Sequence, residues 1–406
     1  MKKQHIINET FLDAILAKKL GTTYTPPKEI NDPDFDEAAK HFIDLLLRAD
    51  GVKPVKTAVV HPIDKESLLG AVRVAQFNVI KPVLIGPQHK IESVEKVNNV
   101  DLEDYQVINV EHSHEAAKKA VELAKKREVA AIMQEALHTD ELMSAVVHKE
   151  NGLRTERRIS HAFLMAVATF PKPFIITDAA INIRPTLEDK RDIVQNAIDL
   201  MHMIKEDKQV RVAVLLAVET LTSAIPTTLD DAALSKMVDR GQITNAIVDG
   251  PLAFDNAISL FAAEAKGISS SVSGNADILV VPDLESGNIL AKQLKYLGQA
   301  VMAGIVLGAR VPIILTSRAD PMDMRIISCV LAAFIYNHTK AKLHIQRALI
   351  PLSPLHQPYN LQVLALFLQK YKEISHIACF VIRRFILPIL LLQKLSVYRK
   401  NIMIKG

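Results

Sequence analysis

Short runs of β-branched and other apolar residues alternate with helix-period segments from about residue 56 to residue 334. This alternation is typical of βα units, which build a mostly parallel sheet covered by helices on both faces. The predicted fold class is therefore α/β. Strands are expected at residues 57–61, 82–86, 105–110, 129–133, 162–168, 174–179, 212–218, 276–282, 305–307 and 311–316.

Ten strands exceed the size of an ordinary open sheet, so two sheets are expected. The 406 residues also leave room for two domains, at roughly 100 to 200 residues each. We therefore predict two three-layer α/β domains.

The composition excludes disordered and fibrous proteins. Apolar residues make up 49% and charged residues 23%, which is ordinary for a globular enzyme. Two cysteines, Cys329 and Cys379, are too few for a disulfide framework, and such sparse use fits a reducing compartment. The first residues contain no apolar segment of the length that a signal peptide needs. A cytoplasmic location is the resulting expectation.

Charge is unevenly distributed along the chain. Residues 337–406 contain 11 Lys and Arg and one acid, whereas residues 1–336 contain 38 basic and 44 acidic side chains. The overall charge of +4 therefore arises from the basic tail, and it gives no reason to expect nucleic-acid binding by the folded body.

Known cofactor motifs do not occur in the sequence. Neither a GxGxxG nor a GxxxxGK[ST] pattern is found, which argues against a dinucleotide or P-loop site. The 14 histidines do not combine with carboxylates at metal-ligand spacings, and His161 is one of the isolated ones. No metal site is predicted.

Acidic and small polar residues follow several predicted strands, among them Asp178, Glu219 and Asp283. Ligands of open α/β sheets bind beyond the carboxyl ends of the strands, so the site is expected in these loops. Each acid taken alone also fits a helix N-cap.

Six blocks of sequence carry a family resemblance. They span residues 136–143, 157–161, 176–183, 248–257, 273–290 and 304–320. In this order they resemble the phosphate acetyl/butyryl transferase family, over about residues 55–334.

The resemblance implies an enzyme that converts acyl-CoA and inorganic phosphate to acyl phosphate and coenzyme A in a ternary complex. Coenzyme A is a substrate, and no metal or redox cofactor is implied. The resemblance also implies a homodimer, with residues 1–160 and 305–336 in one domain, residues 161–304 in the other, and the active site in the interdomain cleft. An acetyl substrate is expected; a butyryl substrate, or a non-catalytic acyl-CoA-binding regulatory domain of the same fold, remains the alternative.

The predicted catalytic residues follow the last strand. Ser317 and Arg318 match the Ser-Arg pair of the family; arginine suits phosphate because its planar fork donates two parallel hydrogen bonds. Ser317 is expected to donate to the carbonyl oxygen. Asp320 is the candidate base for the coenzyme A thiol, although Asp320 before Pro321 also fits a helix N-cap. Asp323 is the second candidate.

Five further residues are predicted to bind substrate. Arg154 and Arg158 belong to a cationic group that suits phosphate or pyrophosphate, although a solvated face is the plainer interpretation. Asp283, Gly287 and Asn288 follow a strand and precede a helix at the expected cleft.

The basic tail at residues 337–406 has three interpretations. It is a sequence from a shifted reading frame, a basic amphipathic surface segment, or an extra packed helix pair. Its longest apolar stretch, residues 377–392, has 16 residues interrupted by Arg383, Arg384 and Pro388, which is too short for a membrane span.

Overall fold

The computed structural model describes residues 42, 45, 48, 52–205, 209–315 and 322–349. Of these, the residues up to 204 and from 209 to 336 belong to one compact unit. Residue 205 and residues 337–349 belong to a second unit, and each unit is considered by itself. The whole sheet lies in the first unit, with the helical residues up to 204 and from 209 to 336.

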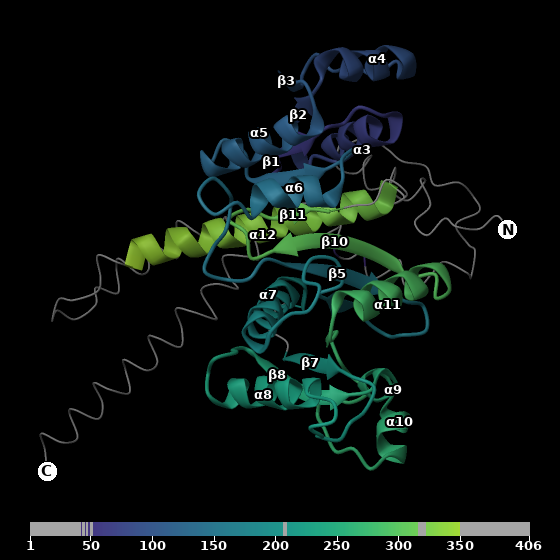
Figure 1. The fold of residues 1–406 in the computed structure, drawn as a ribbon. Coiled ribbons are helices and arrows are strands. Elements are labelled where there is room, and N and C mark those ends of the chain that lie inside the picture. Colours follow the sequence, from purple (N-terminus) through teal and green to yellow (C-terminus); the bar gives the residue numbers. More distant parts are fainter. Residues whose placement is uncertain are drawn as a thin grey trace, which may run out of the picture. The chain divides into compact units, whose positions relative to one another are not determined.

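Eleven strands and ten helices make up the described part of the chain (Figure 1). The strands are β1 Val55–Val60, β2 Ile80–Gly86, β3 Gln106–Asn109, β4 Ala131–Gln134, β5 Ser160–Ala166, β6 Phe174–Thr177, β7 Val210–Leu215, β8 Ala246–Leu252, β9 Ile278–Val280, β10 Val301–Leu307 and β11 Ile313–Ile314. The helices are α3 Lys65–Gln76, α4 Gln88–Asn98, α5 Ser113–Lys125, α6 Thr139–Val146, α7 Leu187–Lys205, α8 Thr227–Asp239, α9 Phe254–Ile258, α10 Leu260–Ala265, α11 Leu284–Tyr296 and α12 Met322–Leu349.

All eleven strands hydrogen-bond into one sheet, in the order β3-β2-β1-β4-β11-β10-β5-β6-β9-β7-β8. On one side of the sheet, the strands β3, β2, β1, β4 and β11 pair in parallel. On the other side, the strands β6, β9, β7 and β8 do the same. The middle pairs β11-β10, β10-β5 and β5-β6 are antiparallel. The predicted α/β class with mostly parallel strands is confirmed.

The expectation of two separate sheets is wrong. Strands β5 and β10 pair along their whole length, from Val301 opposite Ala166 to Leu307 opposite Ser160. Each of them also pairs with the parallel set on its own side, β10 with β11 and β5 with β6. This antiparallel ribbon therefore joins two parallel sets that would otherwise be two sheets.

Strand β8 was not predicted. Its sequence contains Asp249, Gly250 and Pro251, which are typical of a turn. The structure places β8 at the edge of the sheet, where it pairs only with β7 among the described strands. An edge strand tolerates proline because one side of its backbone needs no partner.

Three clusters of buried apolar residues fill the space between the sheet and the helices. The first includes Val59, Leu164 and Ile327, the second Ile132 and Leu142, and the third a set around Met165. Apolar residues are thus buried on both faces of the sheet, as parallel strands require.

Candidate active site

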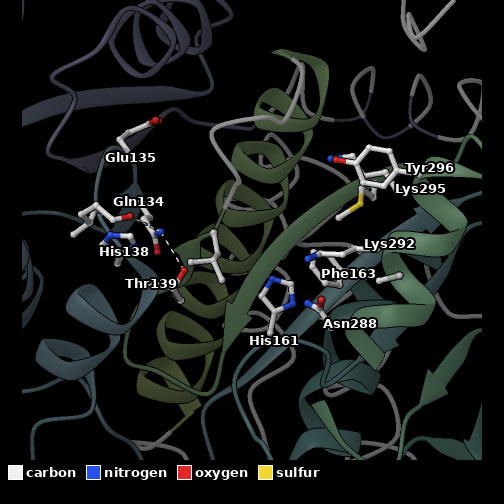
Figure 2. Close-up of a pocket in the computed structure, with 14 residues that line it drawn as sticks. Gln134, Glu135, His138, Thr139, His161, Phe163, Asn288, Lys292, Lys295 and Tyr296 are labelled. Carbon is white, nitrogen blue, oxygen red and sulfur yellow. Dashed lines mark hydrogen bonds between the residues drawn. The ribbon is translucent and has the colours of Figure 1, made fainter. Parts of the chain in front are cut away.

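A cavity of about 540 Å³ opens beside the middle of the sheet (Figure 2). Its walls come from the end of β4 and the start of α6, from β5, from α11, from β10, and from the residue after β11. The lining residues are Gln134, Glu135, Leu137, His138, Thr139, His161, Phe163, Asn288, Ala291, Lys292, Lys295, Tyr296, Met302 and Leu315.

The order of the strands explains why one end of the cavity lies at β4. Strand β1 has β2 on one side and β4 on the other, so the connections after β1 and β4 leave in different directions. Ligand sites in open sheets form at such a switch, beyond the carboxyl ends of the strands. Gln134 is the last residue of β4, and Glu135 follows it directly.

Helix α11 presents one face to the cavity. Asn288, Ala291, Lys292 and Lys295 line it, at the spacing of residues that share a helix face. The Lys295 ammonium lies 5.5 Å from the ring centre of Tyr296. Lys292 forms no ion pair with any residue in the described ranges. Two cations therefore face the cavity from this helix.

Two of the predicted binding residues fix the start of α11. Asp283 is its N-cap, and its carboxylate accepts hydrogen bonds from the Ser286 backbone N–H at 2.8 Å and from the Ser286 hydroxyl at 2.7 Å. A Cβ at Gly287 would lie 2.5 Å from Val281 Cγ2 and 3.0 Å from Ala179 Cβ. Asp283 thus fixes where α11 begins, and Gly287 allows the helix to approach Val281 and Ala179 closely.

Asn288, the next residue, does line the cavity. Its amide Nδ2 donates to the carbonyl oxygen of Ala179 at 3.2 Å, which orients the side chain. Of the five residues predicted to bind substrate, Asn288 is the one that borders this cavity.

The two predicted arginines make contacts elsewhere. Arg158 donates through Nε to Asn182 Oδ1 at 2.6 Å, and the same nitrogen lies 3.5 Å from Asp189 Oδ1. Arg154 is exposed and forms an isolated antiparallel bridge with Ala309. Neither belongs to the cavity lining, and their roles in binding stay predictions.

The predicted catalytic residues Ser317, Arg318 and Asp320 lie outside the described residues, as does the side chain of Asp323. Leu315 lines the cavity and precedes Ser317 by two positions in the sequence. Their roles therefore stay predictions.

A buried ion pair lies at the β4 end of the cavity. Arg325 Nη1 of α12 donates to Glu135 Oε2 at 2.6 Å, and the side chains are 3% and 1% exposed. Burial raises the pKa of Glu135 to about 7, although Arg325 opposes the shift. The pair ties the first turns of α12 to the end of β4.

No role was predicted for His161, which is isolated in the sequence from other possible metal ligands. The structure places it on β5, fully buried, in the wall of the cavity. Its ring packs edge-on against Phe163, with the centroids 4.2 Å apart. Burial lowers the pKa of His161 to about 3, so the imidazole is neutral at physiological pH.

Lys292 and Lys295 were not predicted from the sequence. Their signal was present, because both share a helix face with Asn288 once the helix is known to begin after Asp283. No comparable signal distinguished His161, because its place in the cavity wall depends on segments that are distant in the sequence.

Within the described ranges, no three His, Cys, Asp or Glu side chains are grouped in a way that would hold a metal ion. Over the same part of the chain, no helix is both long and apolar enough to cross a membrane.

Comparison with known proteins identifies the class. The family model "Phosphate acetyl/butaryl transferase" matches residues 136–333. The phosphate acetyltransferase of Rickettsia felis is 96% identical over 346 residues, which cover 85% of this chain and 99% of that protein. The chain belongs to the phosphate acetyl/butyryl transferase family.

More distant relatives are named for two different acyl groups, acetyl and butyryl. A phosphate acetyltransferase of Rhizobium meliloti is 53% identical over 71% of this chain and 91% of its own length. A phosphate butyryltransferase of Clostridium acetobutylicum is 37% identical over 73% of this chain and 98% of its own.

Among solved structures, a branched-chain phosphotransacylase from Enterococcus faecalis superposes with a TM-score of 0.60 at 25% identity, covering 69% of this chain and 99% of that one. A phosphotransacetylase from Streptococcus pyogenes has a TM-score of 0.62 at 20% identity, covering 74% and 98%. The second likeness bears on the fold alone.

Proposed function

We propose that this chain transfers an acetyl group between coenzyme A and inorganic phosphate, and that it does so at the cavity between β5 and α11. The relatives that are 90% to 96% identical are named phosphate acetyltransferases. Those named butyryltransferases are 35% to 37% identical. The acetyl substrate is therefore favoured over butyryl, and an enzyme over a non-catalytic regulatory domain.

The cavity has the polarity that these substrates need. Coenzyme A and phosphate are both anionic, and Lys292 and Lys295 bring two positive charges to the α11 wall. Phe163, Ala291 and Met302 provide apolar surface, which suits a short acyl chain. This combination of cationic and apolar walls in one cavity is the observation that carries the proposal.

In the proposed reaction a phosphate oxygen attacks the carbonyl carbon of acetyl-CoA, and the bond from carbon to sulfur breaks. No acyl-enzyme is required, because both substrates are held together and react directly. Arg318 is proposed to hold the phosphate through two parallel hydrogen bonds. Ser317 is proposed to donate to the carbonyl oxygen as negative charge develops on it.

The leaving thiolate of coenzyme A takes up a proton, and in the reverse direction the thiol loses it. A carboxyl group near the sulfur would assist both steps. Asp320 is proposed for this role, with Asp323 as the second candidate.

We further propose that the enzyme works as a cytoplasmic homodimer without a metal or redox cofactor. Residues 1–160 and 305–336 are proposed to act as one domain and residues 161–304 as the other. Strands β5 and β10, which join the two parallel sets, would then lie at the domain boundary.

Turnover of a panel of acyl-CoAs tests this function. Purified full-length protein should release free coenzyme A from acetyl-CoA only when phosphate is present, and a metal chelator should not reduce the rate. Butyryl-CoA should be a poorer substrate. Folded protein that turns over neither compound would refute the proposed function.

A further inference from the structure

Packing alone does not explain why a histidine occupies position 161. Its side chain is fully buried in the cavity wall, yet neither Nδ1 nor Nε2 has a hydrogen-bond partner in the described part of the chain. Leaving a buried polar group unpaired destabilises a folded protein. A bound substrate with a hydrogen-bonding group would supply a partner for these nitrogens.

The sheet makes room for the imidazole. Residues on β5 alternate between its faces, so His161 and Phe163 share the face toward the cavity. A Cβ at Gly304, on the neighbouring strand β10, would lie 3.0 Å from His161 Nε2 and 2.6 Å from the Leu315 carbonyl oxygen. The absence of a side chain at Gly304 thus leaves the space that the ring occupies.

The surroundings of the ring indicate what it would bind. Phe163, on the same face of β5, and Met302 of β10 are apolar parts of the cavity lining, whereas the lysines are on α11. A phosphate group would be held better by the charged lysines. A neutral imidazole, with one N–H donor and one acceptor nitrogen, suits an uncharged polar group such as a carbonyl.

We propose that His161 is a substrate-contacting residue that donates a hydrogen bond from its neutral imidazole to the carbonyl oxygen of the acyl group. This inference rests on the proposed function. During transfer the new bond from phosphate oxygen to carbon forms as the carbon–sulfur bond breaks, and His161 keeps its proton throughout. The hydrogen bond strengthens as charge develops on the oxygen, and it complements the donor proposed at Ser317.

A neutral donor has a kinetic signature. Because burial lowers the pKa of His161 to about 3, its ring stays neutral between pH 5 and pH 9. Replacing it should therefore lower the rate by the same factor across this range. A histidine acting as a general base would instead produce a difference that depends on pH.

The kinetic experiment compares His161→Phe with His202→Phe. His202 is also a buried histidine, but its Nε2 donates to the Asn245 carbonyl oxygen at 2.6 Å, and it does not line the cavity. We expect His161→Phe to lower kcat for acetyl-CoA by roughly 100-fold, as for other lost oxyanion donors, with little change in KM for phosphate. His202→Phe should leave both constants near wild type.

Ring-nitrogen NMR of wild-type protein labelled with ¹⁵N-histidine provides a test that does not depend on a variant's kinetics. The His161 signal, assigned by its loss in His161→Gln, should shift on addition of acetyl-CoA and stay in place on addition of phosphate alone. If the wild type turns over acetyl-CoA but the signal does not move and His161→Phe keeps the wild-type kcat, the contact is refuted while the function stands. If the wild type shows no turnover, the function itself fails.

Discussion

Replacing Arg325 with methionine should destabilise the protein in a way that depends on pH. Arg325 and Glu135 form the buried ion pair that joins α12 to the end of β4. Methionine fills similar space without a charge, so the carboxylate of Glu135 would remain buried with no opposing cation. Removing one partner of a buried pair typically costs about 3 to 5 kcal/mol.

The direction of the pH effect follows from the pKa of Glu135. Its value in the folded protein, about 7, lies above the ordinary 4.5. The folded state therefore holds the proton more tightly than the unfolded state, and the protein loses stability as pH rises from 4.5 through 7. The shift corresponds to roughly 3 kcal/mol at about 1.4 kcal/mol per unit. Asp64 raises the pKa of Glu135 further, whereas Ser67 and Arg325 lower it.

At pH 8 the carboxyl group of Glu135 is ionised, and Arg325→Met should show the full loss of about 3 to 5 kcal/mol. At pH 5 the group is protonated in both proteins, so the loss should be about 1.4 kcal/mol smaller than at pH 8, because pH 8 lies about one unit above the pKa of Glu135 in the folded wild type. The double variant Glu135→Gln/Arg325→Met should recover much of the stability at pH 8, because no buried charge remains.

Urea unfolding followed by circular dichroism at pH 5 and pH 8 measures these differences. Lys126→Met is the matched control, because it breaks the exposed pair between Lys126 and Glu122 and should barely move the midpoint. An equal loss for Arg325→Met at the two pH values, or a larger loss at pH 5, would show that the Glu135 charge does not govern this contact.

Three further outcomes are expected. Gly287→Ala should lower the unfolding free energy by about 1 to 3 kcal/mol, because its Cβ would lie 2.5 Å from Val281 Cγ2; an unchanged urea midpoint would show that α11 shifts freely. A chain ended after Leu349 should remain soluble and release coenzyme A at the full rate, whereas loss of folding would show that the remaining tail packs on the core. Arg318→Lys should lower kcat/KM for phosphate by about ten- to a hundredfold, while Ser317→Ala should reduce mainly kcat; wild-type phosphate dependence in Arg318→Lys would remove that residue from the site.

Much of the fold was readable from local patterns. The α/β class and ten of the strands follow from runs that alternate with helix-period segments, since each run is a property of adjacent residues. The single sheet was not predictable in the same way. It depends on the pairing of β5 with β10, whose residues are more than 130 positions apart in the sequence.

The site was predicted less completely for the same reason. Asn288 was predicted from a block that resembles the family; it borders the cavity, and its role in binding stays a prediction. The carboxylate of Asp283 caps α11, an alternative that the sequence had left open for acids after strands, and its predicted role in substrate binding is untested. The environment of His161 could not be read from its neighbours in sequence, because Gly304 and α11 create it.

The central proposal is that acetyl transfer takes place at the cavity lined by α11, and charge reversal in that cavity tests it most directly. The measurement is the initial rate of phosphate-dependent coenzyme A release as acetyl-CoA is varied, for Lys292→Glu and for Lys90→Glu. Lys90 is exposed on α4 and does not line the cavity, so it undergoes the same charge reversal elsewhere. Reversal at Lys292 should raise KM for acetyl-CoA by about tenfold or more, equivalent to about 1.4 kcal/mol, while Lys90→Glu should resemble the wild type. Wild-type KM and kcat in both variants would contradict the assignment of the reaction to this cavity.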